Sequence, residues 1–484
     1  MSGQVQLLDC TLRDGAYIVD AAFGTPAMKG IIRKMQESNV DIIECGWLKD
    51  KRHTAGTTFY HTPSDLEQYM AEKNSKTIYV AMIDWDRYDL RSLPEYDGKS
   101  IDAIRVVFPQ NRFREGIGLG RMIREKGYQV YFQAANTLGY SDEDLIVLAE
   151  EVNKADPVCL SIVDTFGAMY GEDLEHIISV LDKHLKRDVK LGFHSHNNQQ
   201  LSFALTMQFV NSLCDRDRDC IVDSSLCGMG RGAGNATTEL VASFLNRKYS
   251  GNYDMNVIMD AIDMYMQYFQ RNYQWGYSTS YFIAGMYCTH VNNISWLLEN
   301  HRTNSRDLRN IIESLSVEER RKYDYDLLES KYIEYQNKMV DDESGVDGLS
   351  AEFRQREILL LLPGKSDLEE SQRVSEEKEK IDRYIDENRP IVIGVNAVLE
   401  GYSYDYLFFS NKVRYQYAEE IYPQLFYSFR RIITSNVKTD SGMNEILVNY
   451  NLLVKRGWEH FDNSGIMCLR LLNKLHVSDV ALAG

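Results

Sequence analysis

Eight short apolar runs, rich in β-branched residues, follow one another through the first half of the chain. The segments between them, such as 25–39 and 141–156, carry apolar residues three and four positions apart, the spacing of an amphipathic helix. Strands that alternate with helices form parallel sheets, and eight such units within roughly 245 residues match a closed (β/α)8 TIM barrel of the α/β class. The runs are VQLLDCTLRD (5–14), VDIIECGW (40–47), KTIYVAMID (76–84), DAIRVVF (102–108), YQVYFQAAN (128–136), VCLSIVDTF (158–166), VKLGFHSHN (189–197) and DCIVDSSLCG (219–228).

Length and charge limit the remaining possibilities. A chain of 484 residues exceeds what one core usually contains, so we expect two or three domains. The net charge of −17 argues against nucleic acid or a membrane as a partner, because both bind basic surfaces. The eight scattered cysteines form no CxxC pair, and the chain shows neither a signal peptide nor a long apolar segment. We therefore expect a reduced cytoplasmic protein, which we also predict to be a homo-oligomer.

Polar side chains gather near the carboxyl ends of several runs. Barrels of this type build their active sites on that face, and a purely structural barrel has no reason to collect polar groups there. Glu44 and Gln133 are accordingly predicted to contact the substrate. The gathered residues are Asp14, Glu44, Asp84, Gln133, Asp164, His194 and His196.

Two histidines in this set indicate a metal site. His194 and His196 are two apart on a strand, so their side chains share a face. With Asp14 they would supply two imidazoles and a carboxylate and leave positions open, which suits a catalytic Mn²⁺, Mg²⁺ or Co²⁺ better than structural zinc. Arg13 would stabilise negative charge on an enolate oxygen beside the metal. Because neighbours on one strand point to opposite faces, we expect no ion pair between Arg13 and Asp14.

Four motifs of the first half resemble a known family. In order, DCTLRDG, IVDTFGAM, GFHSHNN and SSLCGMGRGAGNATTELV resemble the metal-dependent pyruvate aldolases of the 4-hydroxy-2-oxovalerate aldolase type, in the superfamily of hydroxymethylglutaryl-CoA lyase. The resemblance covers about residues 4–300. It implies a lyase that forms or cleaves an aldol of pyruvate, or a related 2-oxo acid, with an aldehyde. It also implies manganese held by Asp14, His194 and His196, with Asn235 at or near the metal, Arg13 at the pyruvate enolate and Thr165 in place of a substrate-contacting serine.

Tyr17 departs from the family pattern, because these aldolases carry a histidine base at its position. A phenol with a pKa of about 10 is a poor base at neutral pH, although a nearby metal or Arg13 could lower that pKa. We predict Tyr17 as the proton shuttle. The alternatives are that His53 or His61, on the loop after the second strand, replaces it, or that Tyr17 only packs over the site.

Two other classes of the superfamily rank lower. Carboxyltransferases of this type place a carbamylated lysine at the end of the sixth strand, where this chain has none, and the loop after the eighth strand is of the aldolase kind. An acyl-CoA-condensing synthase remains the alternative enzyme. A non-catalytic barrel that serves as a scaffold is the alternative outside enzymes.

The second half of the chain changes character. Residues 251–340 are predicted to form helices packed on the barrel, a region that contacts a partner dehydrogenase in the aldolases this chain resembles. Residues 341–355 are polar and contain glycine, which predicts a linker. Residues 356–484 alternate between strands and helices, as in a smaller Rossmann-like α/β domain. The final strand ends the sequence, which predicts either a truncated domain or a strand at the sheet edge.

The turn PGKS in this last segment precedes a predicted helix N-terminus, a position suited to phosphate. It is neither a Walker A loop nor a dinucleotide-binding GxGxxG motif. The segment loosely resembles Rossmann-like domains of the pterin-diphosphokinase and sialyltransferase-associated kind. A nucleotide or nucleotide sugar bound there would make an activated sugar the aldehyde, as in surface-glycan synthesis; the alternative is an oligomerisation domain. The predicted nucleotide-binding residues are Gly364, Lys365, Ser366 and Asn396.

Overall fold

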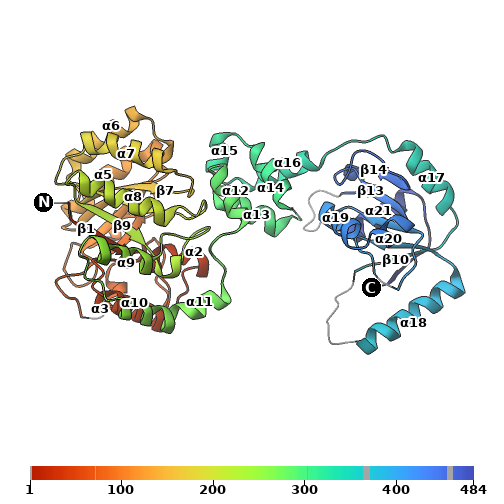
Figure 1. Cartoon of the computed structure of the whole chain (residues 1–484), viewed down its shortest axis with the longest axis horizontal. Coiled ribbons are helices and arrows are strands. Elements are labelled where there is room, and N and C mark those ends of the chain that lie inside the picture. The colour runs from red at the N-terminus through yellow and green to blue at the C-terminus, as the bar shows by residue number, and fades with distance from the viewer. Residues whose placement is uncertain are drawn as a thin grey trace. The chain divides into compact units, whose positions relative to one another are not determined.

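The computed structural model describes residues 3–70, 72–301, 303–363, 371–399, 401–454 and 462–483. These residues form two compact units (Figure 1), and each unit contains its own parallel sheet. The first comprises Met1–Ser295 and Ser316–Tyr323, and the second comprises Trp296–Leu315 and Asp324–Gly484. Across the described ranges, no helix has both the length and the apolar character needed to cross a membrane.

The first unit contains a closed barrel of eight parallel strands, which confirms the predicted (β/α)8 fold. The barrel closes because β1 pairs with β2 on one side and with β9 on the other. A two-residue strand, β3 (Phe59–Tyr60), adds one further parallel pairing to β2. The barrel strands are β1 (Val5–Asp9), β2 (Ile42–Leu48), β4 (Ile78–Asp84), β5 (Ala103–Phe108), β6 (Gln129–Ala134), β7 (Cys159–Asp164), β8 (Lys190–Ser195) and β9 (Cys220–Ser224).

Helices surround these strands, and their apolar faces follow the spacing seen in the sequence. In α6, for example, Leu145, Leu148 and Val152 are buried, and Ser141 caps the first turn by accepting a hydrogen bond from the Asp144 backbone N–H at 3.2 Å. Figure 1 shows α5 to α9 arranged around the strands. The barrel helices are α3 (Thr25–Glu37), α4 (Ser64–Glu67), α5 (Phe113–Glu125), α6 (Asp142–Ala155), α7 (Gly171–His184), α8 (Ser202–Asp215) and α9 (Thr238–Lys248).

The barrel interior has an apolar layer followed by a polar one. Side chains alternate along a strand, so residues two apart share a face. Ile42, Ala103, Tyr131 and Ile221 belong to an apolar cluster that also contains Leu8, Val80 and Cys159. Two positions further along the same strands lie four buried polar residues, which therefore form the next layer toward the carboxyl-end face: Glu44, Arg105, Gln133 and Asp223.

The first predicted strand is shorter than expected. The expected run was 5–14, but β1 ends at Asp9 and Thr11–Asp14 form a helical turn, α1. The Asp9 carboxylate accepts hydrogen bonds from the backbone N–H and the hydroxyl of Thr11, both at 3.0 Å, and these bonds hold the turn. Arg13 and Asp14 consequently do not alternate across a strand. Arg13 Nη1 lies 2.5 Å from Asp14 Oδ1, so the prediction that they form no ion pair was wrong.

The helical region expected at 251–340 is divided between the two units. Residues up to 295, together with α15 (Val317–Arg321), belong to the first unit. The remainder belongs to the second because its rings and apolar side chains pack there: Trp296 stacks on Tyr325 with ring centroids 5.6 Å apart. Besides α15, the helices within residues 251–340 are α10 (Met255–Ala261), the π-helix η5 (Ile262–Met266), α11 (Gln267–Asn272), α12 (Thr279–Met286), α13 (Val291–Asn300), α14 (Ser305–Glu313) and α16 (Tyr325–Gln336).

The predicted linker at 341–355 contains a helix, α17 (Glu343–Phe353). Leu349 and Phe353, four residues apart, are both buried, and the Phe353 ring packs against Tyr406 with centroids 5.2 Å apart. The polar composition of the segment concealed this pair of core positions. The predicted linker therefore contains a helix with two buried apolar residues.

The second unit contains a sheet of six parallel strands in the order β14-β13-β12-β11-β10-β15. In this order β15 is an edge strand that pairs with β10. The strands are β10 (Ile358–Leu361), β11 (Ile391–Val395), β12 (Tyr406–Phe409), β13 (Arg430–Thr434), β14 (Glu445–Val448) and β15 (Val480–Ala483). The helices between them are α18 (Ser371–Asn388), α19 (Lys412–Ile421), α20 (Pro423–Ser428) and α21 (Ser464–Lys474).

Candidate metal centre and active site

The carboxyl-end face of the barrel brings Asp14, His194 and His196 together. Each offers a ligand atom, and these atoms all lie within 4.8 Å of one another. Asp14 ends α1, His194 lies near the end of β8, and His196 follows that strand. All three side chains are buried. Two imidazoles and a carboxylate in this arrangement can hold one divalent ion.

The surroundings of the two histidines fit metal binding. His194 Nδ1 lies 3.0 Å from Asp223 Oδ2. A carboxylate in that position orients the ring and leaves Nε2 for a metal. His196 Nδ1 is buried without a hydrogen-bond partner among the described residues, and burial lowers the pKa of His196 to about 4. His196 is therefore neutral at neutral pH, which is the form that binds a metal.

Asn235 lies beside this trio on the loop after β9. Its Nδ2 donates to Asp14 Oδ2 at 2.8 Å, while its Oδ1 is buried and has no hydrogen-bond partner among the residues described. Leaving a buried acceptor unpaired costs about 1–3 kcal/mol. A cation next to the Asp14 carboxylate would satisfy both this oxygen and the unpartnered nitrogen of His196.

A chain of buried ion pairs in the polar layer leads from Arg13 to His194. Arg13 Nε lies 2.7 Å from Glu44 Oε2, and the same oxygen lies 2.8 Å from Arg105 Nη1. Arg105 Nη2 in turn lies 2.5 Å from Asp223, the carboxylate that contacts His194. Arg13 and His194 are thus positioned by one continuous set of charges across the barrel.

The formal charges in this chain of ion pairs sum to a net negative charge. It contains the three carboxylates of Asp14, Glu44 and Asp223 but only the two guanidiniums of Arg13 and Arg105. Burial alone would raise the pKa values of Asp14 and Asp223, but the neighbouring guanidiniums hold both below the ordinary range. Asp14 and Asp223 therefore stay ionised at neutral pH. Their excess negative charge is complementary to a divalent cation.

The Arg13 guanidinium is buried beside the Trp47 ring and has one nitrogen without a partner among the described residues. Arg13 Nη2 makes no hydrogen bond to any residue that the structure describes, and the guanidinium carbon lies 5.9 Å from the centroid of the Trp47 ring. One edge of this guanidinium is thus available to a ligand. Glu44, which we predicted to contact substrate, lies in the polar layer, where its carboxylate contacts Arg13. Gln133 is in the same layer, where its Nε2 donates to Ser161 Oγ at 2.8 Å.

A small cavity adjoins His196, and Thr165 is one of its lining residues. The Thr165 hydroxyl accepts a hydrogen bond from the Asn136 backbone N–H at 2.7 Å. Asp164 does not line this cavity; it accepts hydrogen bonds from the backbone of the loop that follows β7. The lining residues are Thr165, Phe166, His196, Asn198, Arg231, His290 and Val291.

Residues 113–264, which include His194, His196 and Asn235, match the HMGL-like family. The match lies within the barrel of the first unit, which is called the HMGL-like domain below. It is 25% identical over 266 residues to oxaloacetate decarboxylase of Mycobacterium tuberculosis, a match that covers 53% of this chain and 74% of that protein. It is 26% identical over 269 residues to 4-hydroxy-2-oxovalerate aldolase of Thermomicrobium roseum, covering 53% of this chain and 71% of that protein.

A solved structure shares the fold of the HMGL-like domain. It is the N-terminal domain of a Bacteroides vulgatus protein described as an aldolase, with a TM-score of 0.52 and 24% identity, and the match covers 60% of this chain and 96% of that one. At this identity the likeness shows the fold alone. The two sequence relatives are named a decarboxylase and an aldolase, so this domain is similar to enzymes that make or break carbon–carbon bonds.

Tyr17, on α2 (Ala16–Val19), lies at the mouth of the HMGL-like domain and is 48% exposed. Its ring packs edge-on against Trp47 at 6.2 Å, and the Arg231 guanidinium carbon lies 4.8 Å from the ring centroid. Loss of surrounding water raises the pKa of Tyr17, and Arg231 opposes this only in part. Arg13 also opposes this rise without reversing it, and the lowering of this pKa by a bound metal stays a prediction. Tyr17 therefore carries its proton at neutral pH.

The two histidines considered as replacements for the base are engaged elsewhere in the HMGL-like domain. His53 Nδ1 lies 2.8 Å from the Phe59 carbonyl oxygen, and its Nε2 lies 2.9 Å from the Tyr69 hydroxyl. His61 Nδ1 lies 3.3 Å from the Lys49 carbonyl oxygen. Neither lines the cavity beside His196.

The structure also adds functional residues that the sequence analysis missed. Arg105 and Asp223 stand inside apolar strands, at positions that face the barrel interior. A charged residue in such a run is costly unless it is paired, so their presence could have signalled a buried polar site. Arg231 and His290 carried no comparable signal, because only the folded loops bring them to the cavity.

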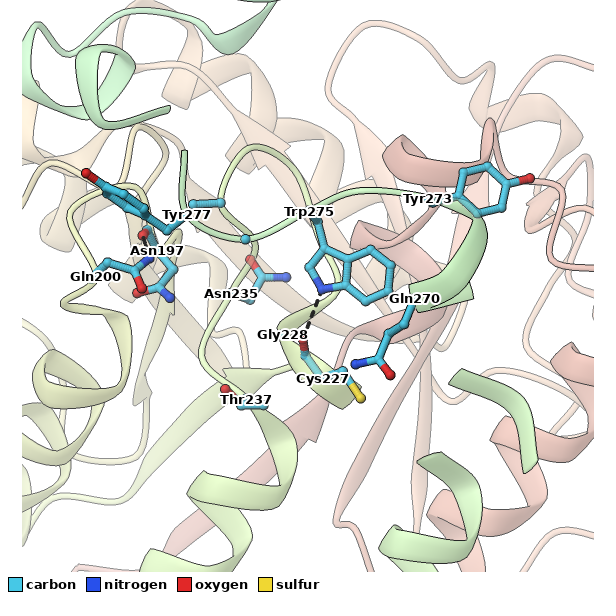
Figure 2. Close-up of a pocket in the computed structure, with 12 residues that line it drawn as sticks. Asn197, Gln200, Cys227, Gly228, Asn235, Thr237, Gln270, Tyr273, Trp275 and Tyr277 are labelled. Atoms are coloured by element: carbon cyan, nitrogen blue, oxygen red, sulfur yellow. Dashed lines mark hydrogen bonds between the residues drawn. The ribbon is translucent and has the colours of Figure 1, made fainter. Parts of the chain in front are cut away.

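A larger cavity of about 380 Å³ shares Asn235 with the metal centre. Figure 2 shows its lining, in which Trp275 Nε1 donates to the Cys227 carbonyl oxygen at 3.0 Å. Among the described residues, its lining includes amide side chains and aromatic rings but neither a carboxylate nor a cation. The labelled lining residues are Asn197, Gln200, Cys227, Gly228, Asn235, Thr237, Gln270, Tyr273, Trp275 and Tyr277.

Proposed function

We propose that the HMGL-like domain forms or cleaves an aldol of pyruvate, or a related 2-oxo acid, with an aldehyde. The observation that carries this proposal is the buried trio of Asp14, His194 and His196 beside the free edge of Arg13. With Asn235, these ligands would hold a divalent ion, Mn²⁺ first and Mg²⁺ or Co²⁺ as alternatives. When bound, such an ion supplies a Lewis acid that polarises a 2-oxo group.

The residues around the ion have separate tasks in this proposal. Arg13, held by Asp14 and Glu44, presents one edge of its guanidinium to negative charge that develops on the enolate oxygen. Thr165 contacts the substrate from the cavity wall. In the direction of condensation the aldehyde oxygen gains negative charge and must take up a proton. Tyr17, protonated at neutral pH, is placed at the mouth to donate it.

An exchange assay tests this proposal. In deuterated water with Mn²⁺, we expect the protein to exchange the methyl protons of pyruvate and, once an aldehyde is added, to form an aldol. Tyr17→Phe should slow condensation by about 100-fold, the lower end of a general-acid effect, and slow exchange less. Tyr268→Phe is the matched control, because Tyr268 is an exposed tyrosine of the same unit.

Other outcomes would replace the proposal or part of it. Equal loss of exchange and condensation in Tyr17→Phe would make Tyr17 the base that acts on pyruvate. Turnover of acetyl-CoA with a 2-oxo acid, without any reaction of pyruvate and aldehyde, would indicate a condensing synthase. Metal binding without exchange would leave the barrel as a scaffold.

Oxaloacetate decarboxylation is the second candidate function, favoured by the relative of that name. Loss of carbon dioxide from oxaloacetate leaves the enolate of pyruvate, so it needs the same charge stabilisation from Arg13. Release of carbon dioxide from oxaloacetate, with no aldol formed from pyruvate, would favour this function.

For the second unit we propose a nucleotide or nucleotide-sugar site at the carboxyl ends of its strands. The N-termini of α19 and α21 are at this edge, and helix N-termini suit phosphate. The strand order also reverses between β10 and β15, and parallel sheets often bind ligands at such a reversal. Asn396 follows β11, and its Oδ1 accepts a hydrogen bond from the Ser410 backbone N–H at 3.0 Å. Its Nδ2 donates to Ser464 Oγ. Gly364, Lys365 and Ser366 lie outside the described residues.

A thermal-shift screen of the full chain with nucleotides and nucleotide sugars tests this site. We expect a nucleotide to raise the melting temperature of the parent but not of Gly364→Asp, because the carboxylate would repel phosphate. Gly348→Asp is the control, since an added Cβ there meets no atom within 4 Å. A shift with a nucleotide sugar would support an activated sugar as the aldehyde. No shift across the panel would leave the unit as an oligomerisation domain.

A further inference from the structure

Arg231 is a cation without an anionic partner at the barrel mouth. Its Nη2 is 2.9 Å from His290 Nε2 and 3.0 Å from Asn292 Oδ1. A guanidinium only donates, so both of these atoms act as acceptors and neither carries a negative charge. Arg231 forms no ion pair within the described part of the chain.

This lack of a counter-ion sets Arg231 apart from the buried arginines of the same unit. Arg13 contacts Asp14, Arg105 contacts Asp223, and Arg218 contacts Asp182 at 2.5 Å. A partly buried guanidinium that lacks a carboxylate is unfavourable. In a chain with a net charge of −17, carboxylates for such pairing are abundant. The missing partner of Arg231 therefore points to an anion that arrives with a ligand.

The position of Arg231 relates that ligand to the metal centre. Its backbone N–H donates to Asp14 Oδ2 at 3.2 Å, and its side chain lines the cavity that also contains His196 and Thr165. The guanidinium is held over the Tyr17 ring at 4.8 Å. A ligand bound at the centre and extending toward Tyr17 would thus meet this cation.

The guanidinium is also held in place before any ligand binds. The His290 backbone N–H donates to the Arg320 carbonyl oxygen at 2.8 Å, and the His290 ring packs on Tyr323 with centroids 4.7 Å apart. These contacts fix the imidazole that accepts from Arg231. A pre-positioned guanidinium suits paired hydrogen bonds to a carboxylate or a phosphate.

We propose that Arg231 binds a carboxylate or phosphate carried by the aldehyde, and so selects anionic acceptors. The inference rests on the proposed aldol function. Arg13 stabilises negative charge on the 2-oxo acid next to the ion, and Arg231 binds the anionic group at the other end of the aldol, at the barrel mouth. The substrate class is accordingly an aldehyde with a second, negatively charged group.

Pairs of aldehydes test this selection. With pyruvate as donor, kcat/KM is compared for succinic semialdehyde against butyraldehyde, and for glyceraldehyde 3-phosphate against glyceraldehyde. We expect at least one pair to favour the anionic member by about tenfold or more, and the pair that does so identifies carboxylate or phosphate as the bound group. Arg231→Gln should remove the preference, and Arg231→Lys should retain part of it because the charge remains. Arg247→Gln, an exposed arginine on α9, is the matched control and should keep the full preference.

The outcomes separate this inference from the function on which it rests. If the parent protein does not exchange the methyl protons of pyruvate, the proposed function fails. If it exchanges them but uses charged and neutral aldehydes equally, only the role of Arg231 is overturned. The role is likewise overturned if Arg231→Gln raises the KM for pyruvate and keeps the preference among aldehydes, because Arg231 would then bind the 2-oxo acid.

Discussion

Replacing His196 with alanine, or removing the divalent ion with a chelator, is expected to abolish exchange of the pyruvate methyl protons. Either change removes the group that polarises the 2-oxo acid and leaves Arg13 as the remaining stabiliser of the enolate. Loss of about 4 kcal/mol of stabilisation corresponds to about a thousandfold slower exchange. Proton NMR in deuterated water measures the exchange, and elemental analysis measures the bound metal.

The matched control for this variant is His176→Ala. His176 is an exposed histidine on α7 that pairs with Asp142 at 2.7 Å and does not line the cavity beside His196. It should leave both bound metal and exchange at the parent level. Adding Mn²⁺ back to the chelated parent should restore exchange. Exchange that continued in metal-free protein would contradict the metal-dependent mechanism.

Arg105→Met is expected to destabilise the HMGL-like domain by about 3–5 kcal/mol, the usual cost of removing one partner from a buried ion pair. The change leaves Glu44 and Asp223 in the barrel interior with only Arg13 to balance them. Because Asp223 also contacts His194, metal affinity should fall by about 10–100-fold. Urea unfolding of the metal-free protein measures the stability, and Mn²⁺ titration measures the affinity.

Arg91→Met provides the comparison for this stability change. Arg91 pairs with Asp89 at 2.6 Å on the surface, where the arginine side chain is 91% exposed. Surface pairs contribute about 0–1 kcal/mol, so this variant should unfold close to the parent midpoint. If both arginine variants unfolded alike, the chain of buried ion pairs would not be a source of stability.

The sequence by itself determined the barrel and the grouping of the three candidate metal ligands. Apolar runs that alternate with amphipathic segments permit few folds other than a parallel barrel of this length, and the structure has that barrel. His194 and His196 could be placed together because residues two apart on one strand point to the same face. Asp14 could join them because a barrel collects the carboxyl ends of its strands at one face. These inferences needed only local periodicity and a closed sheet.

The tertiary structure alone decided which charges meet. Glu44, Arg105 and Asp223 come from three different strands, and only the register of the closed barrel puts Arg105 in contact with both carboxylates. Strand periodicity predicts that Arg13 and Asp14 point to opposite faces, but the turn at Asp9 brings their side chains into contact. Arg231 met His290 only when residues 59 positions apart folded over the barrel mouth. Long-range contacts of this kind depend on packing between elements, which the pattern within one element does not encode.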